Sequence, residues 1–189
     1  MALFCLLGTV DAAEMSVARR TLKSGPAIGK YVPSFYSRAV TGPLMNKSIC
    51  YVCRNGGRPV VMILMRQIGP QFRSLLQNVG RVVDRNRASG LRGFGVLLSQ
   101  DAIKATSAVQ TFSFNNKISI PLTVGGEGIG AASCQNVHND AALTVVLYRR
   151  RKVVARFAFR DGELKRADVR QLIHRIREFA GERVSTSQK

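Results

Sequence analysis

The chain has 189 residues, a length typical of one domain with tails that is large enough to bury a hydrophobic core. Its hydrophobic content (46%) and charged content (21%) are ordinary for a globular protein. The charge balance is not, because 29 Lys and Arg against 11 Asp and Glu leave a formal net charge of +18. Such a surface attracts acidic proteins or other polyanions. No RNP, zinc-finger or Gly-rich phosphate motif accompanies the charge, so nucleic acid is a minor alternative as a partner.

The first 28 residues differ from the rest of the chain. Met1–Val10 is a short apolar run, and Val10-Asp11-Ala12 is a passable cleavage site, although a basic n-region is absent. The run is either a signal-peptide remnant, which predicts export to the periplasm or cell envelope, or the tail of a cytoplasmic protein; we favour the remnant. No internal run reaches the roughly 18 apolar residues of a membrane span. We therefore expect a leader and basic linker over 1–28, a folded domain over 29–180 and a disordered tail over 181–189.

The domain opens with a short edge strand expected over residues 36–40. A polar loop over 44–58 then holds the two cysteines of a C-x-x-C pair, Cys50 and Cys53. Residues 60–65 (VVMILM) form an unbroken apolar run, which is typical of a strand buried on both faces of a parallel sheet.

A helix and a second buried strand follow. Gly69-Pro70 predicts a helix start, because proline at the first helical position loses no useful hydrogen bond. Apolar residues at helical spacing come next, and Gly90 is predicted to end the helix. Residues 91–98 form the second strand, in which Gly93 and Gly95 share a face where a neighbour packs closely.

The middle of the chain predicts one more helix and strand. Asp101 is a suitable N-cap for a helix from residue 102 to about 112. Residues 118–124 form a third strand, in which Pro121 indicates an edge position or a bulge. The segment 125–139 is a long, glycine-rich loop, and loops of that length are often functional or mobile.

The last third predicts a β-hairpin and a final amphipathic helix. Strands over 142–148 and 153–159 flank the basic turn Arg149-Arg150-Arg151-Lys152, and the helix follows Asp161-Gly162. The alternation of strands and helices before the hairpin implies right-handed crossovers and a parallel half-sheet, to which the hairpin adds an antiparallel half.

This arrangement makes specific pairings testable. Residues 60–65 and 91–98 should be adjacent parallel strands, because a helix connects them. Residues 145–147 should lie antiparallel beside residues 60–65.

Three segments carry a resemblance to a known family. The final hairpin with Asp161-Gly162-Glu163-Leu164 and the last helix, the opening Val32-Pro33-Ser34-Phe35, and Ile120-Pro121-Leu122-Thr123-Val124 each have a counterpart in it. Together they resemble the thioredoxin superfamily in its redoxin branch, which includes peroxiredoxin-like and thiol-disulfide interchange proteins. The resemblance covers about residues 29–180. It implies an α/β fold, a three-layer α/β/α sandwich with a mixed central sheet.

The chain departs from that family where the family does its chemistry. A thioredoxin has W-C-G-P-C after its central strand, whereas this chain has Gln67-Ile68-Gly69-Pro70-Gln71. Ile68 and Gln71 therefore occupy both cysteine positions. Leu143 stands where the family places a cis-proline, and the P-x-x-x-T-x-x-C motif of peroxiredoxins is absent. Ordinary thioredoxin and peroxidase chemistry are thus not implied.

Cys50 and Cys53 allow three interpretations. They are a redox dithiol, a structural disulfide or half of a metal site, because C-x-x-C serves all three. Arg54, Arg58 and the basic field favour the thiolate, which is the attacking species in exchange. The redox interpretation requires that the loop fold over the vacant helix start at Pro70.

Two weaker sites complete the set of candidates. The first is a tetrahedral zinc site, which would combine Cys50 and Cys53 with Cys134 and His138. The favoured alternative is that Cys134 is a small residue in a Gly/Ala-rich segment and that His138 is a surface side chain. The turn Arg149, Arg150, Arg151 and Lys152 is either an anion-binding patch or a solvated turn that discourages edge pairing.

The leading hypothesis for function is thiol-disulfide exchange or redox sensing by Cys50 and Cys53 with a protein disulfide partner. The alternative is a non-catalytic thioredoxin-like module that binds an acidic protein or other polyanion. A structural zinc site is a lesser alternative, and no cofactor is implied.

Overall fold

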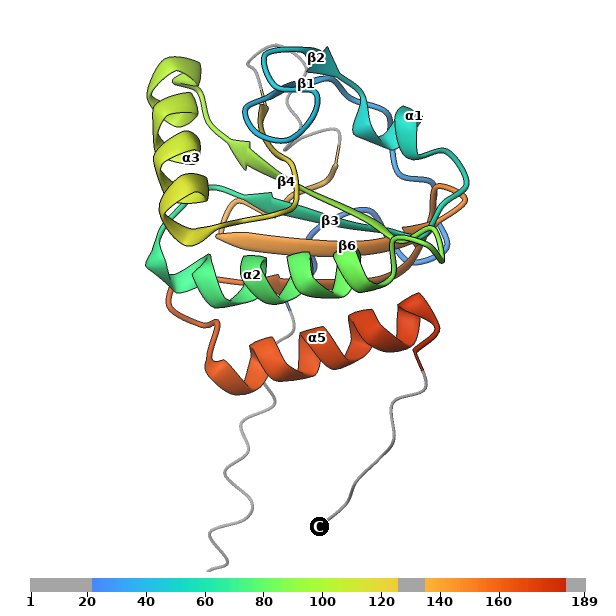
Figure 1. Ribbon diagram of the computed structural model, residues 1–189. Coiled ribbons are helices and arrows are strands. Elements are labelled where there is room, and N and C mark those ends of the chain that lie inside the picture. The colour runs from blue at the N-terminus through green and yellow to red at the C-terminus, as the bar shows by residue number, and fades with distance from the viewer. Residues whose placement is uncertain (1–21, 126–134, 183–189) are drawn as a thin grey trace, which may run out of the picture.

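The computed structural model describes residues 22–125 and 135–182 of the chain (Figure 1). The described residues form one mixed sheet of seven strands with helices packed on it. In chain order the elements are β1 (Ser37–Ala39), β2 (Ser48–Ile49), α1 (Tyr51–Asn55), β3 (Val60–Met65), α2 (Pro70–Arg85), β4 (Arg92–Leu98), α3 (Ala102–Asn116), β5 (Leu122–Gly125), β6 (Leu143–Arg149), β7 (Lys152–Phe159) and α5 (Arg166–Ala180). The expected leader up to residue 21 and the expected tail from residue 183 lie outside the described residues, as does 126–134 in the glycine-rich loop.

The strands lie in the order β2-β1-β5-β4-β3-β6-β7. β3 pairs in parallel with β4, with Val60 opposite Arg92. On its other side β3 pairs antiparallel with β6, with Val60 opposite Tyr148. β5 extends the parallel part and β7 extends the antiparallel part. Both expected pairings of residues 60–65 are therefore confirmed.

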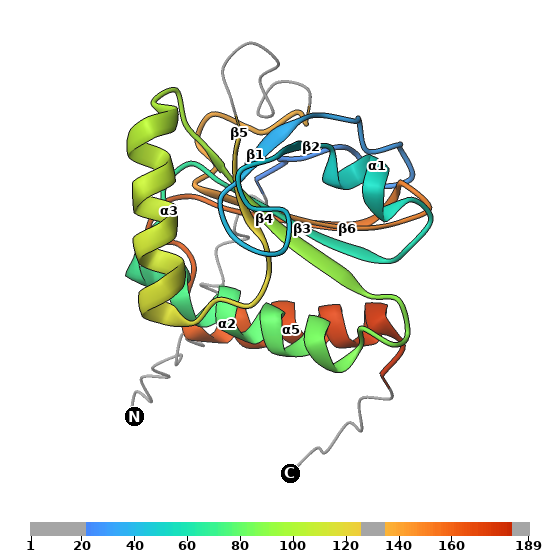
Figure 2. The same ribbon diagram turned by 45° about the horizontal axis from the view of Figure 1, so that its top comes forward.

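The sheet is covered on both faces (Figures 1 and 2). Helices α2 and α5 lie on one face, and α1 with the segment before β1 lies on the other. Helix α3 runs beside β5, and its buried Ala105 and Val109 belong to the same apolar cluster as α2 and α5. An apolar cluster on each face confirms the predicted three-layer α/β/α architecture. The layer that contains α1 is thin, because α1 has five residues.

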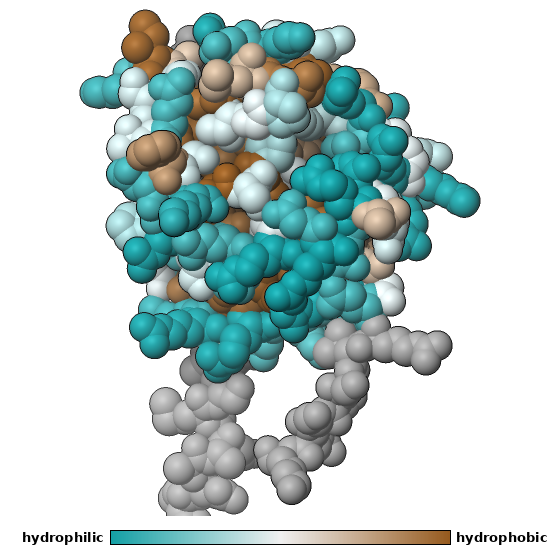
Figure 3. All heavy atoms as spheres, viewed as in Figure 1, coloured by the Kyte–Doolittle hydropathy of each residue, from teal (hydrophilic) through white to brown (hydrophobic). Residues whose placement is uncertain are grey.

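Much of the positive charge lies on the outer surface of α2 and α5, where hydrophilic side chains gather (Figure 3). The exposed arginines of these two helices are Arg73, Arg81, Arg85, Arg166, Arg170 and Arg175. No helix within residues 22–125 and 135–182 is long and apolar enough to cross a membrane.

The prediction of a polar loop over residues 44–58 is wrong. β2 and α1 lie within it, and Tyr51 and Val52 are 7% and 0% exposed. These two side chains pack on the sheet, which fixes the short helix. A helix of this length shows no helical periodicity in the sequence, because it makes little more than one turn.

The strand expected at the edge over residues 36–40 is interior, and so is β5, for which Pro121 had indicated an edge position or a bulge. β2 pairs outside β1, and β5 lies between β1 and β4. Pro121 immediately precedes β5, so its missing N–H group removes no bond from the ladder. Its carbonyl oxygen instead accepts a hydrogen bond from the Gly95 amide at 2.9 Å.

The helix ends differ in part from expectation. α2 ends at Arg85, where the Asn86 side chain donates to a carbonyl of the last turn at 2.8 Å; Gly90 instead occupies the next turn, with φ of +90°. α3 continues to Asn116, beyond the expected end. Asp101 caps α3 as predicted, because its carboxylate accepts a backbone hydrogen bond from the first turn at 2.9 Å.

Residues 24–26 precede the expected domain boundary, yet they are buried against the rest of the fold. Ser24 is 1% exposed, and its hydroxyl lies 2.6 Å from the hydroxyl of Thr144 on β6. The same hydroxyl accepts the His138 amide at 3.0 Å. The packed structure therefore includes this segment.

Gly93 and Gly95 lie where neighbours pack closely, as predicted. A Cβ atom at Gly95 would meet Leu122 Cδ2 at 2.7 Å, and one at Gly93 would meet Val83 Cγ2 at 2.9 Å. We expect Gly95→Ala to lower the free energy of unfolding by about 1–3 kcal/mol, because the added methyl group overpacks the core. Urea denaturation measures the change.

The matched control is Gly57→Ala. Gly57 is exposed, and a Cβ atom there would meet Arg150 Cγ at an ordinary 3.8 Å. We expect this variant to be neutral or slightly more stable, because alanine restricts the unfolded chain. Equal destabilisation by both substitutions would contradict the packing argument.

Candidate functional site

The C-x-x-C pair lies at the start of α1 and is joined in a disulfide bond. The Cys50–Cys53 S–S distance is 2.18 Å and the Cα–Cα distance is 5.3 Å. Cys50 is the N-cap of α1, and its sulfur accepts a hydrogen bond from the Cys53 amide at 3.1 Å. The prediction that the two cysteines lie close enough to join is confirmed. Their catalytic role stays a prediction.

The two sulfur-bearing residues differ in burial. Cys50 is 5% exposed and belongs to the apolar cluster on the α1 face, whereas Cys53 is exposed. A reagent or partner from solvent therefore reaches Cys53 first. In exchange chemistry access influences which sulfur is attacked, and Cys53 is the more accessible member of this pair.

Helix α1 is fastened to the sheet by aromatic packing. The Tyr51 ring stacks on Phe94 of β4, with ring centroids 5.0 Å apart and an interplanar angle of 18°. Burial raises the pKa of Tyr51 above its usual range, although the positive charge of Arg54 opposes the shift. The buried Asn55 at the end of α1 faces the adjacent strand β6. There, burial raises the pKa of Tyr148, while the nearby Asn55 side chain and the charge of Arg151 act in the opposite direction.

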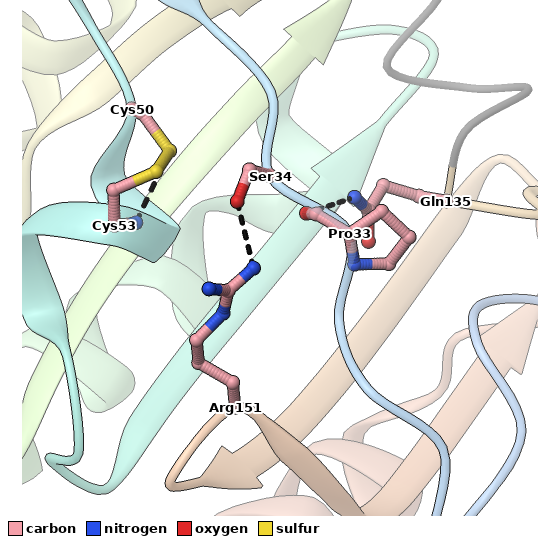
Figure 4. The surroundings of a disulfide bond; sticks show 6 residues. All are labelled: Pro33, Ser34, Cys50, Cys53, Gln135 and Arg151. Carbon is pink, nitrogen blue, oxygen red and sulfur yellow. Dashed lines mark hydrogen bonds between the residues drawn. A yellow bond between two sulfur atoms is a disulfide. The ribbon is translucent and has the colours of Figure 1, made fainter.

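The turn between β6 and β7 also contacts the surroundings of the disulfide (Figure 4). The Arg151 guanidinium points toward Ser34 and donates to its hydroxyl at 2.7 Å. The Arg151 carbonyl accepts the Val32 amide at 2.7 Å, and the Arg150 amide donates to the Gly57 carbonyl at 3.2 Å. The hairpin, the segment before β1 and the loop after α1 are thus bonded together.

The disulfide and the N-terminus of α2 are far apart in the fold. α1 leads into the start of β3 and α2 follows its end, and a six-residue strand spans about 20 Å. The two helices also pack on opposite faces of the sheet. The condition set for the redox interpretation, that the cysteine segment folds over the α2 terminus, is therefore not met, because Tyr51 and Val52 anchor α1 on the other face. Any exchange by this pair depends on the start of α1 and not on the start of α2.

The start of α2, where a thioredoxin has its cysteines, is occupied by other contacts. α2 begins at Pro70, and no side chain caps it. The Gln67 amide donates to Asp161 at 2.6 Å, and the Arg66 guanidinium donates to backbone carbonyls of residues 137–138 at 3.5 and 3.3 Å. Arg66, Gln67 and Asp161 line a cavity of about 230 Å³. The described residues contain no cis peptide bond.

The basic turn, predicted as an anion patch, sends its side chains in different directions. Arg149 donates to the carbonyl of Phe179 at 3.0 Å and lies 5.5 Å from the centre of that ring. Arg151 reaches the segment before β1, and Lys152 lies 5.3 Å from the ring centre of Tyr31. The cluster is dense in sequence but does not converge in space, because strand residues alternate between faces.

The predicted metal set is not assembled among the described residues. Cys50 and Cys53 are bonded to each other, and a metal would require both as thiolates. Cys134 lies outside the described residues. His138 is half-exposed, and its Nδ1 accepts the Asp140 amide at 3.1 Å. Within residues 22–125 and 135–182, no three His, Cys, Asp or Glu side chains gather in a way that could hold a metal ion.

Sequence reasoning missed the supporting residues of the site. Tyr51, Asn55 and Tyr148 hold α1 in place but belong to no motif. The adjacent apolar pair Tyr51-Val52 was the available signal, since a solvated loop has no reason to carry it.

The parallel β3–β4 pair, the antiparallel β6–β7 hairpin and the terminal helix α5 define a thioredoxin-like fold. This confirms the resemblance to redoxins at the level of the fold.

Comparisons with known proteins agree with that assignment. No protein-family model and no curated protein matches the sequence. A candidate protein disulfide isomerase from Bacteroides thetaiotaomicron has a TM-score of 0.64 at 16% identity, over 85% of this chain and 96% of that one. A secreted disulfide oxidoreductase of Mycobacterium tuberculosis has a TM-score of 0.57 at 14% identity, over 76% and 95%. Peroxiredoxin Q of Xanthomonas campestris has a TM-score of 0.56 at 11% identity, over 77% and 91%.

Proposed function

We propose that the protein carries out thiol-disulfide exchange with a dedicated partner protein through Cys50 and Cys53. The observation that carries the proposal is the joined pair with one buried and one exposed member. Arg54 follows Cys53 directly, and Arg151 reaches into the surroundings of the disulfide. Positive charge at a dithiol stabilises the thiolate, which is the reactive form.

The exchange has two steps in the reducing direction. The Cys53 thiolate attacks one sulfur of the partner disulfide, which forms a mixed disulfide and releases the other partner sulfur as a thiolate. The Cys50 thiolate then attacks the Cys53 sulfur and releases the second partner thiolate. The Cys50–Cys53 bond re-forms, and the partner gains two electrons and two protons.

The scaffold is suited to both redox states. The disulfide joins residues only three positions apart, so the chain-entropy model gives it about 2 kcal/mol of stabilisation. The larger apolar cluster, on the α2 and α5 face, contains neither cysteine, and Cys50 is one of many members of the cluster on the other face. Reduction should therefore leave the domain folded, as a cycling dithiol requires.

The experiment that tests this function is a redox titration of the pair against glutathione, read by mass spectrometry of alkylated protein. An exchanging pair should have a reduction potential above about −300 mV, because exposed disulfides are more oxidising than structural ones. A potential below that value would identify a structural disulfide and overturn the proposal.

The same preparation tests how general the activity is. The dithiol form should reduce a generic protein disulfide slowly, because the helix terminus and the cis-proline that serve thioredoxins are not at this pair. The Cys50→Ser, Cys53→Ser double variant sets the background. Fast turnover that disappears in the double variant would contradict the restriction to a dedicated partner.

The compartment proposed for the protein is outside the cytoplasm. The short apolar run at residues 1–10 supports this, and so does the likeness in fold to a secreted disulfide oxidoreductase. Disulfides persist in such oxidising compartments.

A second candidate function is a non-catalytic module that binds an acidic protein. The net charge of +18 and the exposed arginines of α2 and α5 favour it. Under this alternative, binding of an acidic partner weakens with salt and is unchanged in the cysteine double variant.

A further inference from the structure

A pocket of about 340 Å³ lies between α1, the end of α2 and the starts of β4 and β5. Its most prominent feature is a set of four arginines from two segments of the chain, Arg54 and Arg58 in and just after α1, and Arg87 and Arg92 just after α2 and at the start of β4. Among the described residues, no acidic side chain lines it. The remaining wall is partly apolar, with Leu44 and Val83 among its members.

Three of the guanidinium groups, those of Arg58, Arg87 and Arg92, are close enough to affect one another. The pKa of Arg92 is lowered by burial first, and then by the charges of Arg58 and Arg87. Of these four arginines, only Arg87 has a carboxylate partner among the described residues. That partner is Asp84 at 3.0 Å, and the pair is half-exposed. Positive charge in the pocket is therefore only partly neutralised within the described structure.

The arginines are held in place by the backbone. Arg92 donates to the carbonyls of Arg87 and Leu91 at 3.0 and 2.8 Å, and Arg58 lies 3.5 Å from the Arg54 carbonyl. Such contacts orient a guanidinium group and leave other N–H donors available, since each group carries five. The arrangement is thus positioned before any ligand binds.

Tyr51 adds an unsatisfied donor to the same wall. Its side chain is 93% buried, as the residue's 7% exposure implies, and its hydroxyl has no hydrogen-bond partner among the described residues. A buried polar group without a partner is unfavourable, so this hydroxyl is a candidate contact for a bound ligand or water.

We propose that this pocket binds a small anion of the phosphate class that carries at least two negative charges, such as a pyrophosphate group. Arginine forks match phosphate oxygens with two parallel hydrogen bonds, and several arginines together require more than one negative charge. The volume lies at the lower end of the range for small-molecule sites, so the ligand is a small molecule and not a nucleic-acid duplex. The site stands independently of the cysteine chemistry.

The test is calorimetric titration of the full chain with inorganic pyrophosphate at physiological ionic strength. The variants are Arg58→Ala and Arg92→Ala, with Arg92→Lys to keep the charge and remove the fork. We expect Arg58→Ala and Arg92→Ala each to raise the Kd about 10- to 100-fold, the effect of losing charge-assisted hydrogen bonds. Arg92→Lys should raise it less, but measurably.

The matched control is Arg170→Ala, which removes the same charge from the exposed surface of α5. It should change the Kd less than about twofold, because screening weakens charges more than a Debye length away. Equal weakening by Arg170→Ala and the pocket variants would show that net charge alone binds the anion, and would overturn the site.

Two further titrations define the ligand class. ADP should bind at least as tightly as pyrophosphate if the apolar wall accepts an organic group, and more weakly if the site takes the free anion; either result supports a pyrophosphate site. Citrate, with a similar charge on carboxylates, should bind more weakly, and citrate binding as tight as pyrophosphate would overturn the phosphate assignment. The Cys50→Ser, Cys53→Ser variant should retain pyrophosphate binding, which separates failure of this proposal from failure of the exchange function.

Discussion

Replacing Phe94 by alanine is expected to lower the free energy of unfolding by about 3–5 kcal/mol, the cost of truncating a buried phenylalanine. Phe94 is 0% exposed in the middle of β4, and its ring is the platform on which Tyr51 stacks. The substitution therefore removes both core packing and the main aromatic contact of α1. Urea denaturation of the oxidised protein measures the loss.

Phe72→Ala is the matched control that separates the loosening of α1 from the overall loss of stability. Phe72 is 3% exposed on α2 and belongs to the apolar cluster on the opposite face. It should cost a similar amount of stability without loosening α1. Under native conditions, dithiothreitol should reduce the Cys50–Cys53 bond faster in Phe94→Ala than in Phe72→Ala. Equal rates would show that the stacking does not hold the cysteine segment in place.

The two cysteines should differ in reactivity by at least about tenfold once the bond is reduced, because access limits attack on the buried sulfur. Cys50→Ser leaves the exposed Cys53, and Cys53→Ser leaves the buried Cys50. Iodoacetamide should alkylate the first variant faster than the second. Peptide mapping by mass spectrometry separates these sites from Cys5 and Cys134.

Alkylation of the same two variants in 8 M urea provides the control, because the protein is unfolded there and neither thiol is buried. The rates of the two variants should then converge, because both thiols are fully accessible. If Cys50 reacts faster in the folded protein, the order of attack proposed for the exchange is reversed. Equal rates in the folded state would mean that burial of Cys50 does not restrict access.

The central sheet could be predicted from the sequence because its signals are local and strong. The apolar run 60–65 identifies a strand buried on both faces, and the helix between it and residues 91–98 requires a parallel crossover. The pairing of β6 with β3 followed from the order of elements and the family resemblance. These features needed no knowledge of how side chains from distant segments meet.

The surroundings of the cysteines could not be predicted in the same way. A helix of five residues is too short to show a period, so the sequence of α1 predicts a loop. Its position depends on the contact between Tyr51 and Phe94, which lie 43 positions apart in the sequence. The arginine pocket could not be predicted for the same reason, because Arg54 and Arg92 become neighbours only through the β3–β4 pairing.

The turn between β6 and β7 shows where the chain has given up some stability. Arg150 and Arg151 have φ angles of +51° and +63°, which a two-residue hairpin turn of type I′ requires at both central positions. For a residue with a side chain, the left-handed conformation costs roughly 1–2 kcal/mol, and Asn-Gly would serve the turn better. An engineer who seeks a more thermostable variant should therefore look first at position 150, because position 151 also supplies the guanidinium that contacts Ser34.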